Sequence, residues 1–251
     1  MAVKRSQGIA RALRMIDLVA AQQPVGVSAL ARLLDEDRSA VQRAVLSLAD
    51  AGWLRQAPDA PRHWELSAHL FTIAHLPQSG TDLRDRARKG LEALSEATGE
   101  TAFLAVPDGR RFIVIDVIES RHMLRMAPRI GEIIEPEMSA TGRATLAWLD
   151  PGEQEAALDR PVSQAQAREY EAVRARGYAV SIGEVFSGAT NLAAAIFDAR
   201  GRPMAVAGLC GPTERLDGAH LARAGEGLAR LARQLSRSAP HMSEAPMLEP
   251  A

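Results

Sequence analysis

Near the start of the chain, hydrophobic residues recur three and four positions apart, the spacing that places side chains on one face of a helix. Three segments have this pattern: residues 8–21, 28–34 and 38–51. Ser28 is suited to cap the second helix, and Gly52 to follow the C-terminus of the third. The apolar faces hold Ile9, Leu13, Ile16 and Val19 in the first segment, and Val41, Val45 and Leu48 in the third. The pattern predicts three short helices, the last two joined by a tight turn.

After the third helix, the residues change to short strand-like runs. Residues 53–56 and 63–66 stand on either side of the turn-rich segment APDAPR, which predicts a β-hairpin. Three short helices followed by a hairpin are the arrangement of a winged helix-turn-helix. We therefore expect residues 1–66 to form a DNA-binding domain of this type.

The third predicted helix carries polar side chains beside its apolar face. Four of them crowd its N-terminal turns: Arg38, Ser39, Gln42 and Arg43. In the major groove, arginine pairs with guanine or phosphate, glutamine reads adenine, and serine suits phosphate or base. A solvated helix surface is the ordinary alternative, and the helix-turn-helix context favours DNA contact over it. Arg11 in the first helix and Arg62 in the wing are further candidates for phosphate contact.

The remainder of the chain alternates helical and extended patterns. Residues 67–81 predict a linker helix, and a helix capped by Asp82 opens a second domain over residues 82–237. In this domain we expect strands at residues 101–106, 111–119, 123–126, 190–198 and 204–210, and helices at 140–149, 153–158, 164–176 and 220–235. Strand pairs linked by hairpins, with helices grouped between them, predict an α+β domain with an antiparallel sheet. Residues 238–251 are expected to form a flexible tail.

Composition and charge narrow the functional classes. The 251 residues are 47% hydrophobic and 24% charged, and no apolar run reaches the roughly 18 residues of a membrane span. The N-terminus lacks a secretory apolar core, so we expect a cytoplasmic protein without a membrane partner. Residues 1–66 carry nine Lys and Arg against seven Asp and Glu, although the net charge of the chain is −1. That distribution is compatible with a polyanionic partner for the N-terminal domain.

The sequence contains little that predicts catalysis, a metal site or a cofactor. Its single cysteine, Cys210, excludes an internal disulfide, and no residues have metal-ligand spacing. The six histidines have no spacing that indicates a catalytic triad. A hydrolase that uses Cys210, or the pair Glu135 and Glu137, is the enzymatic alternative, but no nucleophile stands beside a base in the sequence. We therefore expect a protein that is not an enzyme and has no cofactor.

Three stretches, taken together, resemble the IclR-type bacterial transcription regulators. The first is VGVSALARLLDEDRSAVQRAVLSLADAGWLRQ followed by HWELSAHLF, the second is LRMAPRIGEIIEPEMSATGRATLAWL, and the third is RGYAV followed by TNLAAAIFDARGRPMAVAGLCGP. The resemblance extends to about residue 237. It implies a winged helix-turn-helix, a linker helix and a GAF-like effector-binding domain. It also implies homodimers or homotetramers, paired through their N-terminal helices and linkers, that bind a double-stranded DNA operator and respond to a small organic acid.

The resemblance further implies an effector pocket in the second domain. The matching positions are Met123, Met126, Ala140, Thr141, Ser181, Asn191, Gly208 and Cys210. Two methionines and few polar groups favour a roomier, more apolar pocket and a larger, aromatic acid. The backbone N–H groups of Ala140 and Thr141, at a helix start, are candidates to hold its carboxylate. Core packing is the alternative role for Met123 and Met126, and an inert buried thiol is the alternative for Cys210.

One departure from the family concerns the turn before the third helix. Where the family usually has Gly-Leu-Pro, this chain has Asp35-Glu36-Asp37. Acidic side chains near DNA phosphates weaken binding unless they face away or cap a helix, so we expect one of these acids to cap the third helix. A dimer or tetramer of this kind is expected to recognise a pseudo-palindromic operator, with affinity altered by the effector. A constitutive DNA-binding protein whose second domain only oligomerises is the remaining alternative.

Overall fold

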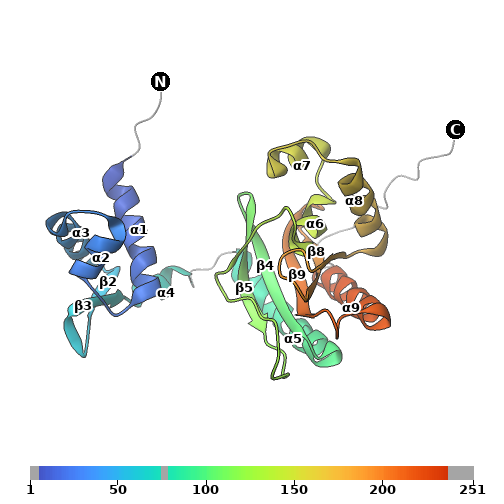
Figure 1. Cartoon of the computed structure of the whole chain (residues 1–251), viewed down its shortest axis with the longest axis horizontal. Coiled ribbons are helices and arrows are strands. Elements are labelled where there is room, and N and C mark those ends of the chain that lie inside the picture. The colour runs from blue at the N-terminus through green and yellow to red at the C-terminus, as the bar shows by residue number, and fades with distance from the viewer. Residues whose placement is uncertain (1–5, 75–78, 237–251) are drawn as a thin grey trace. The chain divides into compact units, whose positions relative to one another are not determined.

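The computed structural model describes residues 6–74 and 79–236, and the chain divides into two units between residues 78 and 79 (Figure 1). One hydrophobic core lies in the N-terminal unit, and two lie in the C-terminal unit. Within the described ranges, no helix is long and apolar enough to cross a membrane. The predicted tail, residues 238–251, lies outside the described residues.

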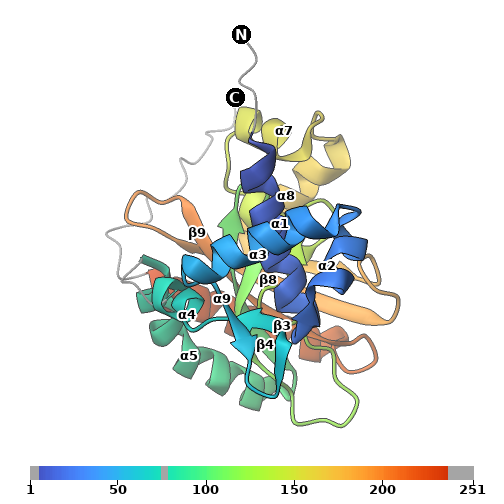
Figure 2. The same cartoon turned by 90° about the vertical axis from the view of Figure 1, so that its left-hand side faces the viewer.

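The N-terminal unit is a winged helix-turn-helix, as predicted. Its elements are α1 (Gln7–Gln22), β1 (Val25–Gly26), α2 (Val27–Leu34), α3 (Arg38–Asp50), β2 (Leu54–Ala57), β3 (Ala60–Leu66) and α4 (His69–Ala74). The wing strands β2 and β3 pair antiparallel, and β1 adds a third strand on the other side of β3. The sequence did not predict β1, because two residues are too few to show a pattern. Figure 2 faces this unit and shows α1, α2 and α3 together with β3.

Packing decides which side of α1 is buried. Met15 and Val19 are fully buried in the core of this unit. Ile9 and Leu13, predicted to share an apolar face with Val19, instead expose 64% and 59% of their surface. The core-facing side is therefore rotated toward Met15, which leaves an apolar strip of α1 that the described residues do not cover.

The ends of the helices show which sequence signals determine them. Asp37 caps α3, which confirms that one acid of the triplet has this role, and Gly52 follows the helix with a φ of 83°. Ser28, predicted to cap α2, instead lies in its first turn. The helix begins at Val27, and Gly26 occupies the cap position without a side-chain hydrogen bond.

The predicted linker helix, residues 67–81, falls only partly within the described residues. There α4 ends at Ala74, and the next described helix, α5 (Ser79–Thr98), already includes residues 79–81. Because α5 begins at Ser79, Asp82 lies inside the helix and is not its cap. Gly80, which was expected to interrupt the helical pattern, is tolerated within α5. The predicted apolar face of α5 is buried and consists of Leu83, Ala87, Leu91 and Leu94.

The C-terminal unit is an α+β domain with an antiparallel sheet, as predicted. After α5 come β4 (Thr101–Asp108), β5 (Arg111–Ile118), β6 (Ile133–Ile134), α6 (Ala140–Leu146), α7 (Pro151–Leu158), α8 (Gln164–Arg176), β7 (Ala179–Ile182), β8 (Ala189–Phe197), β9 (Pro203–Pro212) and α9 (Gly218–Ser236). The strands form one six-stranded sheet in the order β6-β5-β4-β9-β8-β7. Every neighbouring pair is antiparallel.

Helices cover both faces of this sheet (Figure 1). On one face, α5 and α9 pack through residues such as Leu91 and Leu228. On the other, α6 and α8 pack through residues such as Val173. Because successive strand residues point to opposite faces, Leu104 faces the first layer and Phe103 the second. The central strands β4, β8 and β9 are therefore mostly buried on both sides, and the second layer contains the cavity described below.

One predicted strand, residues 123–126, is absent from the segment between β5 and β6. Residues 123–126 form no strand, and β6 takes the place beside β5, with Ile134 opposite Phe112. Met123 is 99% exposed, so the apolar residues of this segment do not reflect a buried sheet position. A short apolar run does not distinguish a strand from an irregular segment held by contacts elsewhere in the fold.

Candidate functional site

The helix α3 presents the four predicted polar side chains on the protein surface. Its opposite side is fixed by Val41 and Val45, which are fully buried. The exposed residues are Arg38, Ser39, Gln42 and Arg43. One helical turn apart, Nη1 of Arg43 donates a hydrogen bond to Oγ of Ser39 over 3.3 Å. The second helix of a helix-turn-helix thus carries a basic, polar surface, the surface that enters the major groove in such motifs.

The N-terminal end of α3 is built around Asp37. Its Oδ1 accepts hydrogen bonds from the backbone N–H groups of Ser39 at 2.9 Å and Ala40 at 3.1 Å, and from the Ser39 hydroxyl. The Ser39 hydroxyl, with these N–H groups, lowers the pKa of the Asp37 carboxyl. The Ser39 proton is committed to Asp37, so within the protein Ser39 links the helix cap to Arg43.

Arg11 of α1 forms an ion pair with Glu36, in the turn before α3. The two side chains expose 31% and 22% of their surface. Arg11, predicted to contact phosphate, therefore has an acidic partner within the protein. The pair ties α1 to the turn that leads into α3 and neutralises a second acid of the triplet. The third acid, Asp35, ends α2 in the left-handed conformation with a φ of 54°.

The wing presents Arg62 on β3, where its side chain is exposed as a phosphate contact requires. On the neighbouring strand, Arg55 pairs with Glu65 directly opposite it, with Nη2 and Oε2 2.9 Å apart. Arg55 is thus partly neutralised across the hairpin. Arg62 thus remains the wing arginine for which a phosphate contact is predicted.

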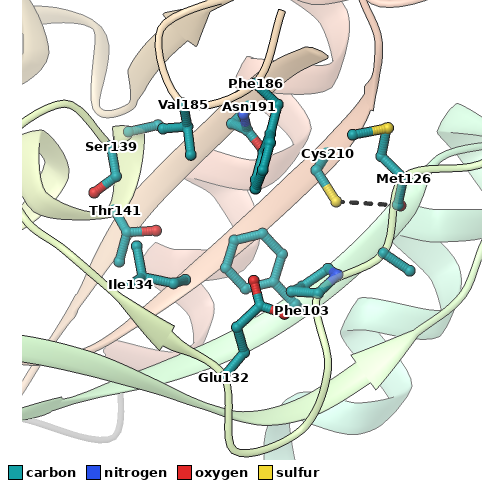
Figure 3. Close-up of a pocket in the computed structure, with 13 residues that line it drawn as sticks. Phe103, Met126, Glu132, Ile134, Ser139, Thr141, Val185, Phe186, Asn191 and Cys210 are labelled. Atoms are coloured by element: carbon teal, nitrogen blue, oxygen red, sulfur yellow. Dashed lines mark hydrogen bonds between the residues drawn. The ribbon is translucent and has the colours of Figure 1, made fainter.

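The C-terminal unit contains a cavity of about 240 Å³ (Figure 3). Its walls come from β4, residues 126–134, the start of α6, the β7–β8 loop, β8 and β9. The lining residues are Phe103, Met126, Ala127, Pro128, Glu132, Ile134, Ser139, Ala140, Thr141, Val185, Phe186, Asn191 and Cys210. A mostly apolar lining with a few placed polar groups is typical of small-molecule sites.

Five of the eight predicted pocket residues line this cavity: Met126, Ala140, Thr141, Asn191 and Cys210. The other three lie outside its lining. Met123 is exposed in the irregular segment, and Ser181 is buried with its hydroxyl donating to the Met138 carbonyl oxygen over 3.1 Å. Gly208 lies against the ring of Phe103, where any Cβ would overlap that ring. Gly208 therefore shapes the cavity indirectly, by leaving room for Phe103.

Sequence reasoning missed several lining residues, among them Phe103, Glu132 and Phe186. Phe103 pairs with Gly208 across β4 and β9, and a large residue opposite a glycine is a signal once the strand order is known. Glu132 and Phe186 lie outside helices and strands, where no periodicity relates a position to the cavity.

The start of α6 supplies hydroxyl groups to the cavity. Ser139 caps this helix: its Oγ accepts from the Gly142 N–H at 3.0 Å and donates to the Glu135 carbonyl oxygen at 2.7 Å. Only glycine fits at position 142, because a Cβ would overlap the carbonyl oxygen of Pro136. The Thr141 side chain points toward the cavity (Figure 3). The tight loop before α6 thereby fixes where its first turn meets the cavity.

Cys210 is a buried, protonated thiol. Burial, followed by the negative charges of Glu100 and Glu132, raises its pKa to about 12. Its Sγ donates a hydrogen bond to the Met126 carbonyl oxygen over 3.3 Å. A thiol in this state is a poor nucleophile at neutral pH, since the thiolate is the reactive form.

Glu135 and Glu137, the acid–base pair of the enzymatic alternative, are both engaged in surface ion pairs. Glu135 lies 3.0 Å from Nε of Arg111, and Glu137 lies 2.7 Å from Nη2 of Arg160. Neither lines the cavity. Across the described residues, no group of three or more His, Cys, Asp or Glu is placed to hold a metal ion.

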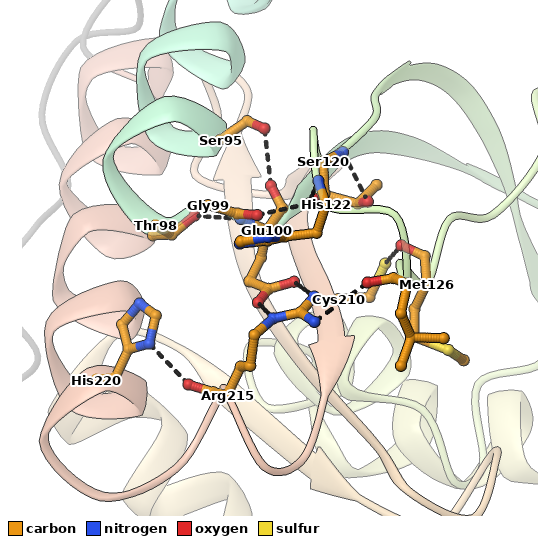
Figure 4. A network of polar contacts seen from close by, with 12 residues as sticks. Ser95, Thr98, Gly99, Glu100, Ser120, His122, Met126, Cys210, Arg215 and His220 are labelled. Atoms are coloured by element: carbon orange, nitrogen blue, oxygen red, sulfur yellow. Dashed lines mark hydrogen bonds and ion pairs between the residues drawn. The ribbon is translucent and has the colours of Figure 1, made fainter.

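A buried ion pair supports the irregular wall of the cavity (Figure 4). Glu100, which is 1% exposed, receives two N–H groups of Arg215, with Nη2 and Oε2 2.8 Å apart. Nη1 of Arg215 also donates to the Leu124 carbonyl oxygen over 3.1 Å. With the bond between Cys210 and Met126, these contacts link the start of β4, the end of β9 and residues 124–126.

Comparisons with known proteins identify both units. Residues 8–58 match the IclR helix-turn-helix domain, and residues 77–237 match the bacterial transcriptional regulator IclR C-terminal domain. The chain is 28% identical to the HTH-type transcriptional regulator XynR of Escherichia coli, covering 92% of this chain and 96% of XynR. It is 29% identical to the transcriptional repressor IclR of the same organism, covering 84% and 81%. An IclR homolog from Microbacterium hydrocarbonoxydans, solved in complex with 4-hydroxybenzoate, has the same fold, with a TM-score of 0.78 at 19% identity over 93% of this chain and 100% of that one. The two domain matches together span most of the sequence, and this chain belongs to the IclR family of bacterial transcriptional regulators.

Proposed function

We propose that this regulator binds a pseudo-palindromic operator in the cytoplasm as a homodimer or homotetramer, and that a small aromatic acid in the C-terminal cavity changes its affinity for DNA. The observation that carries the effector part is the lining of the cavity. There the rings of Phe103 and Phe186 accompany the hydroxyl of Thr141 and the amide of Asn191. Apolar walls with a few polar groups favour a flat, mainly apolar ligand that has one polar end.

The DNA-binding part of the proposal rests on α3. Arg38, Gln42 and Arg43 are exposed near its N-terminal end, and the acids of the preceding turn are occupied by a helix cap and an ion pair. Arginine and glutamine are the side chains that pair bidentately with guanine and adenine in the major groove. Arg62 in the wing adds a phosphate contact that orients the domain on the duplex.

The size of the cavity supports a single-ring effector. Its volume of about 240 Å³ is below the roughly 300–1,000 Å³ of sites for drug-sized ligands. The structurally similar Microbacterium protein binds 4-hydroxybenzoate, a ligand of this size class. We propose that the effector's ring lies near Phe103 and Phe186. Its carboxylate would then be held by the hydroxyl of Thr141 and the backbone N–H groups of Ala140 and Thr141.

Exposed apolar residues support an oligomer. Ile9 and Leu13 lie one turn apart on α1 with more than half of their surface exposed. Uncovered leucine and isoleucine on one helix face are typical of a surface that binds another copy or another helix. We propose that α1 helices of two protomers pair there, which places two copies of α3 for two half-sites of an operator.

The proposed switch requires that the effector bind the two DNA-affinity states unequally. Coupling free energies of this kind are typically about 1–3 kcal/mol, a five- to 150-fold change in affinity. We also propose that the protein is not an enzyme, because Cys210 is protonated and Glu135 and Glu137 are ion-paired at the surface. Turnover of a bound acid would contradict this part.

The experiment that tests the proposal combines calorimetry with a DNA gel shift. The full chain is titrated with benzoate, hydroxybenzoates and the small keto acid pyruvate, and operator binding is then measured with and without each acid. We expect heat and a change of DNA affinity with an aromatic acid. A response to pyruvate alone would overturn the aromatic-acid proposal, and effector binding without any change in DNA affinity would favour a constitutive regulator.

A further inference from the structure

The cavity holds one charged side chain, and that side chain is an acid. Among the residues that line it there is no lysine, arginine or histidine, and Glu132 carries the only formal charge. Figure 3 shows its carboxylate directed toward the cavity, beside the ring of Phe103. A negative charge in the wall repels an organic anion and lowers its affinity, so the carboxylate calls for a further role.

The position of Glu132 is fixed by its backbone and by one carboxylate oxygen. Its carbonyl oxygen accepts from the Val114 N–H of β5 at 3.0 Å, and its own N–H donates to the Arg129 carbonyl oxygen at 2.9 Å. The carboxylate oxygen Oε2 accepts from the Arg129 N–H at 2.9 Å. Among the described residues, the other oxygen, Oε1, has no hydrogen-bond donor. Oε1 of Glu132 is therefore an oriented hydrogen-bond acceptor in the cavity wall.

We propose that Glu132 is a specificity-determining residue: its carboxylate accepts a hydrogen bond from a hydroxyl or amino group on the ring of the effector. This inference rests on the proposed function, and it narrows the effector class to aromatic acids that carry a hydrogen-bond donor on the ring. The acid's own carboxylate is then expected to lie away from Glu132, near the Thr141 hydroxyl, because two carboxylates side by side repel each other.

The preference for a donor arises because a bound ligand either pairs the Glu132 carboxylate or leaves it unpaired. A ring without a donor displaces water from the carboxylate and leaves an acceptor unpaired, which disfavours binding. A ring with a donor replaces that water by a charge-assisted hydrogen bond. A ligand that makes a hydrogen bond to a charged group binds roughly tenfold to hundredfold more tightly than one that leaves this group unpaired. Because Glu132 is partly exposed, we expect the lower part of that range.

The test compares ligands that differ only in the donor. Calorimetry on the full chain measures the affinities of the three monohydroxybenzoates, the three monofluorobenzoates and benzoate itself. For the wild-type protein we expect at least one hydroxybenzoate to bind about tenfold or more tightly than the fluorobenzoate substituted at the same position. In Glu132→Leu that preference should vanish or reverse, and in Glu132→Gln, which retains an acceptor oxygen without the charge, it should shrink.

The matched control is Glu135→Gln, the same chemical change at a nearby glutamate whose side chain pairs with Arg111 and does not line the cavity. It should keep the wild-type preference. A wild-type protein that binds benzoate as tightly as every hydroxybenzoate would overturn the role of Glu132 and leave the aromatic-acid proposal standing. The same holds if folded Glu132→Gln and Glu132→Leu both keep the full preference. No binding of any aromatic acid to the wild type would overturn the proposed function and this inference with it.

Discussion

Arg43, proposed to contact DNA, is held in place by its own helix. Its guanidinium donates to Ser39, and the Ser39 hydroxyl donates to the capping carboxylate of Asp37. Replacing Arg43 by alanine should weaken operator binding by about 1–3 kcal/mol, if it reads a base as its place on the helix predicts. A gel shift measures the loss. Arg230→Ala on α9 removes the same charge far from α3 in the sequence and serves as the control, and equal operator affinity for both variants would remove Arg43 from the recognition surface.

Two substitutions at Asp37 distinguish its capping role from the effect of its charge. Asp37→Asn keeps an oxygen that accepts from the helix, so its melting temperature should stay close to that of the wild type, whereas Asp37→Ala should lower it. Both variants remove a negative charge beside the side chains that are proposed to face DNA. We therefore expect Asp37→Asn to bind DNA more tightly than the wild type at low salt. Unchanged or weaker binding would mean that the acid does not face the phosphates.

The same residue makes a pH prediction. The pKa of Asp37 is lower in the folded protein than in the unfolded chain, because the folded state donates hydrogen bonds to its carboxylate. Its contribution to stability is therefore present above the ordinary carboxyl pKa of 3.8 and is lost as the pH falls through the lowered value. Melting curves of the wild type and Asp37→Ala should differ at neutral pH and converge in acid. A constant difference down to the lowest pH would contradict this.

Cys210 gives a prediction about reactivity. With its pKa raised by burial from 9.0 to about 12, the thiolate fraction at pH 8 is roughly a thousandfold smaller than that of an ordinary thiol. The native protein should therefore be alkylated very slowly by iodoacetamide and rapidly after denaturation. Mass spectrometry follows the reaction without ambiguity, because the chain has a single cysteine. Fast labelling of the native protein would mean that β9 opens to solvent.

At the scale of elements, local signals were sufficient wherever they marked both ends of a helix. Residues 164–176 were predicted as a helix, and α8 has these bounds because Ser163 and Gln166 form a capping box and Gly177 ends it in the left-handed conformation. The prediction for residues 123–126 was wrong because this segment is held by contacts with residues far away in the sequence. Its Leu124 carbonyl oxygen bonds to Arg215, 91 positions along the chain. No local pattern contains such a contact.

The candidate site shows the same difference between local and distant contacts. The four residues of α3 lie on one regular helix, where the buried positions Val41 and Val45 determine which side chains face outward. The cavity instead joins six segments. The predicted residues that line it mostly lie on or beside regular elements, as Asn191 does on β8, whereas Glu132 and Phe186 lie in loops whose placement depends on the whole domain.

The ion pair of Glu100 and Arg215 yields a prediction for the irregular wall. Arg215→Met leaves a buried carboxylate without its partner and should destabilise the C-terminal unit by about 2–4 kcal/mol. The double variant Glu100→Gln with Arg215→Met removes that charge and should regain part of the stability. Effector affinity should not return with it, because the Leu124 carbonyl oxygen still lacks its donor and residues 124–126 remain unsupported. Thermal unfolding and calorimetry measure the two properties, and recovery of both would mean that Arg215 acts on stability alone.

At the scale of the whole molecule, the proposed binding to a two-half-site operator requires that protomers assemble. A single α3 covers one half-site, so tight binding to a pseudo-palindrome requires two copies held together. The exposed pair Ile9 and Leu13 on α1 is the apolar strip that the core of the unit leaves uncovered. Replacing both by glutamate places like charges at the proposed contact between copies, where their repulsion and desolvation oppose pairing.

The double variant Ile9→Glu with Leu13→Glu should therefore separate the N-terminal units and lower operator affinity by roughly a hundredfold to ten-thousandfold, the gain that linked binding provides. Light scattering reports the oligomeric state and a gel shift reports the affinity. Leu33→Glu, at an exposed leucine of α2, is the control and should keep the wild-type assembly. A smaller assembly with unchanged half-site binding would locate the loss in pairing through α1. If the double variant keeps both the wild-type mass and the wild-type operator affinity, α1 does not join the protomers, and the operator's two half-sites must be brought together by the C-terminal units.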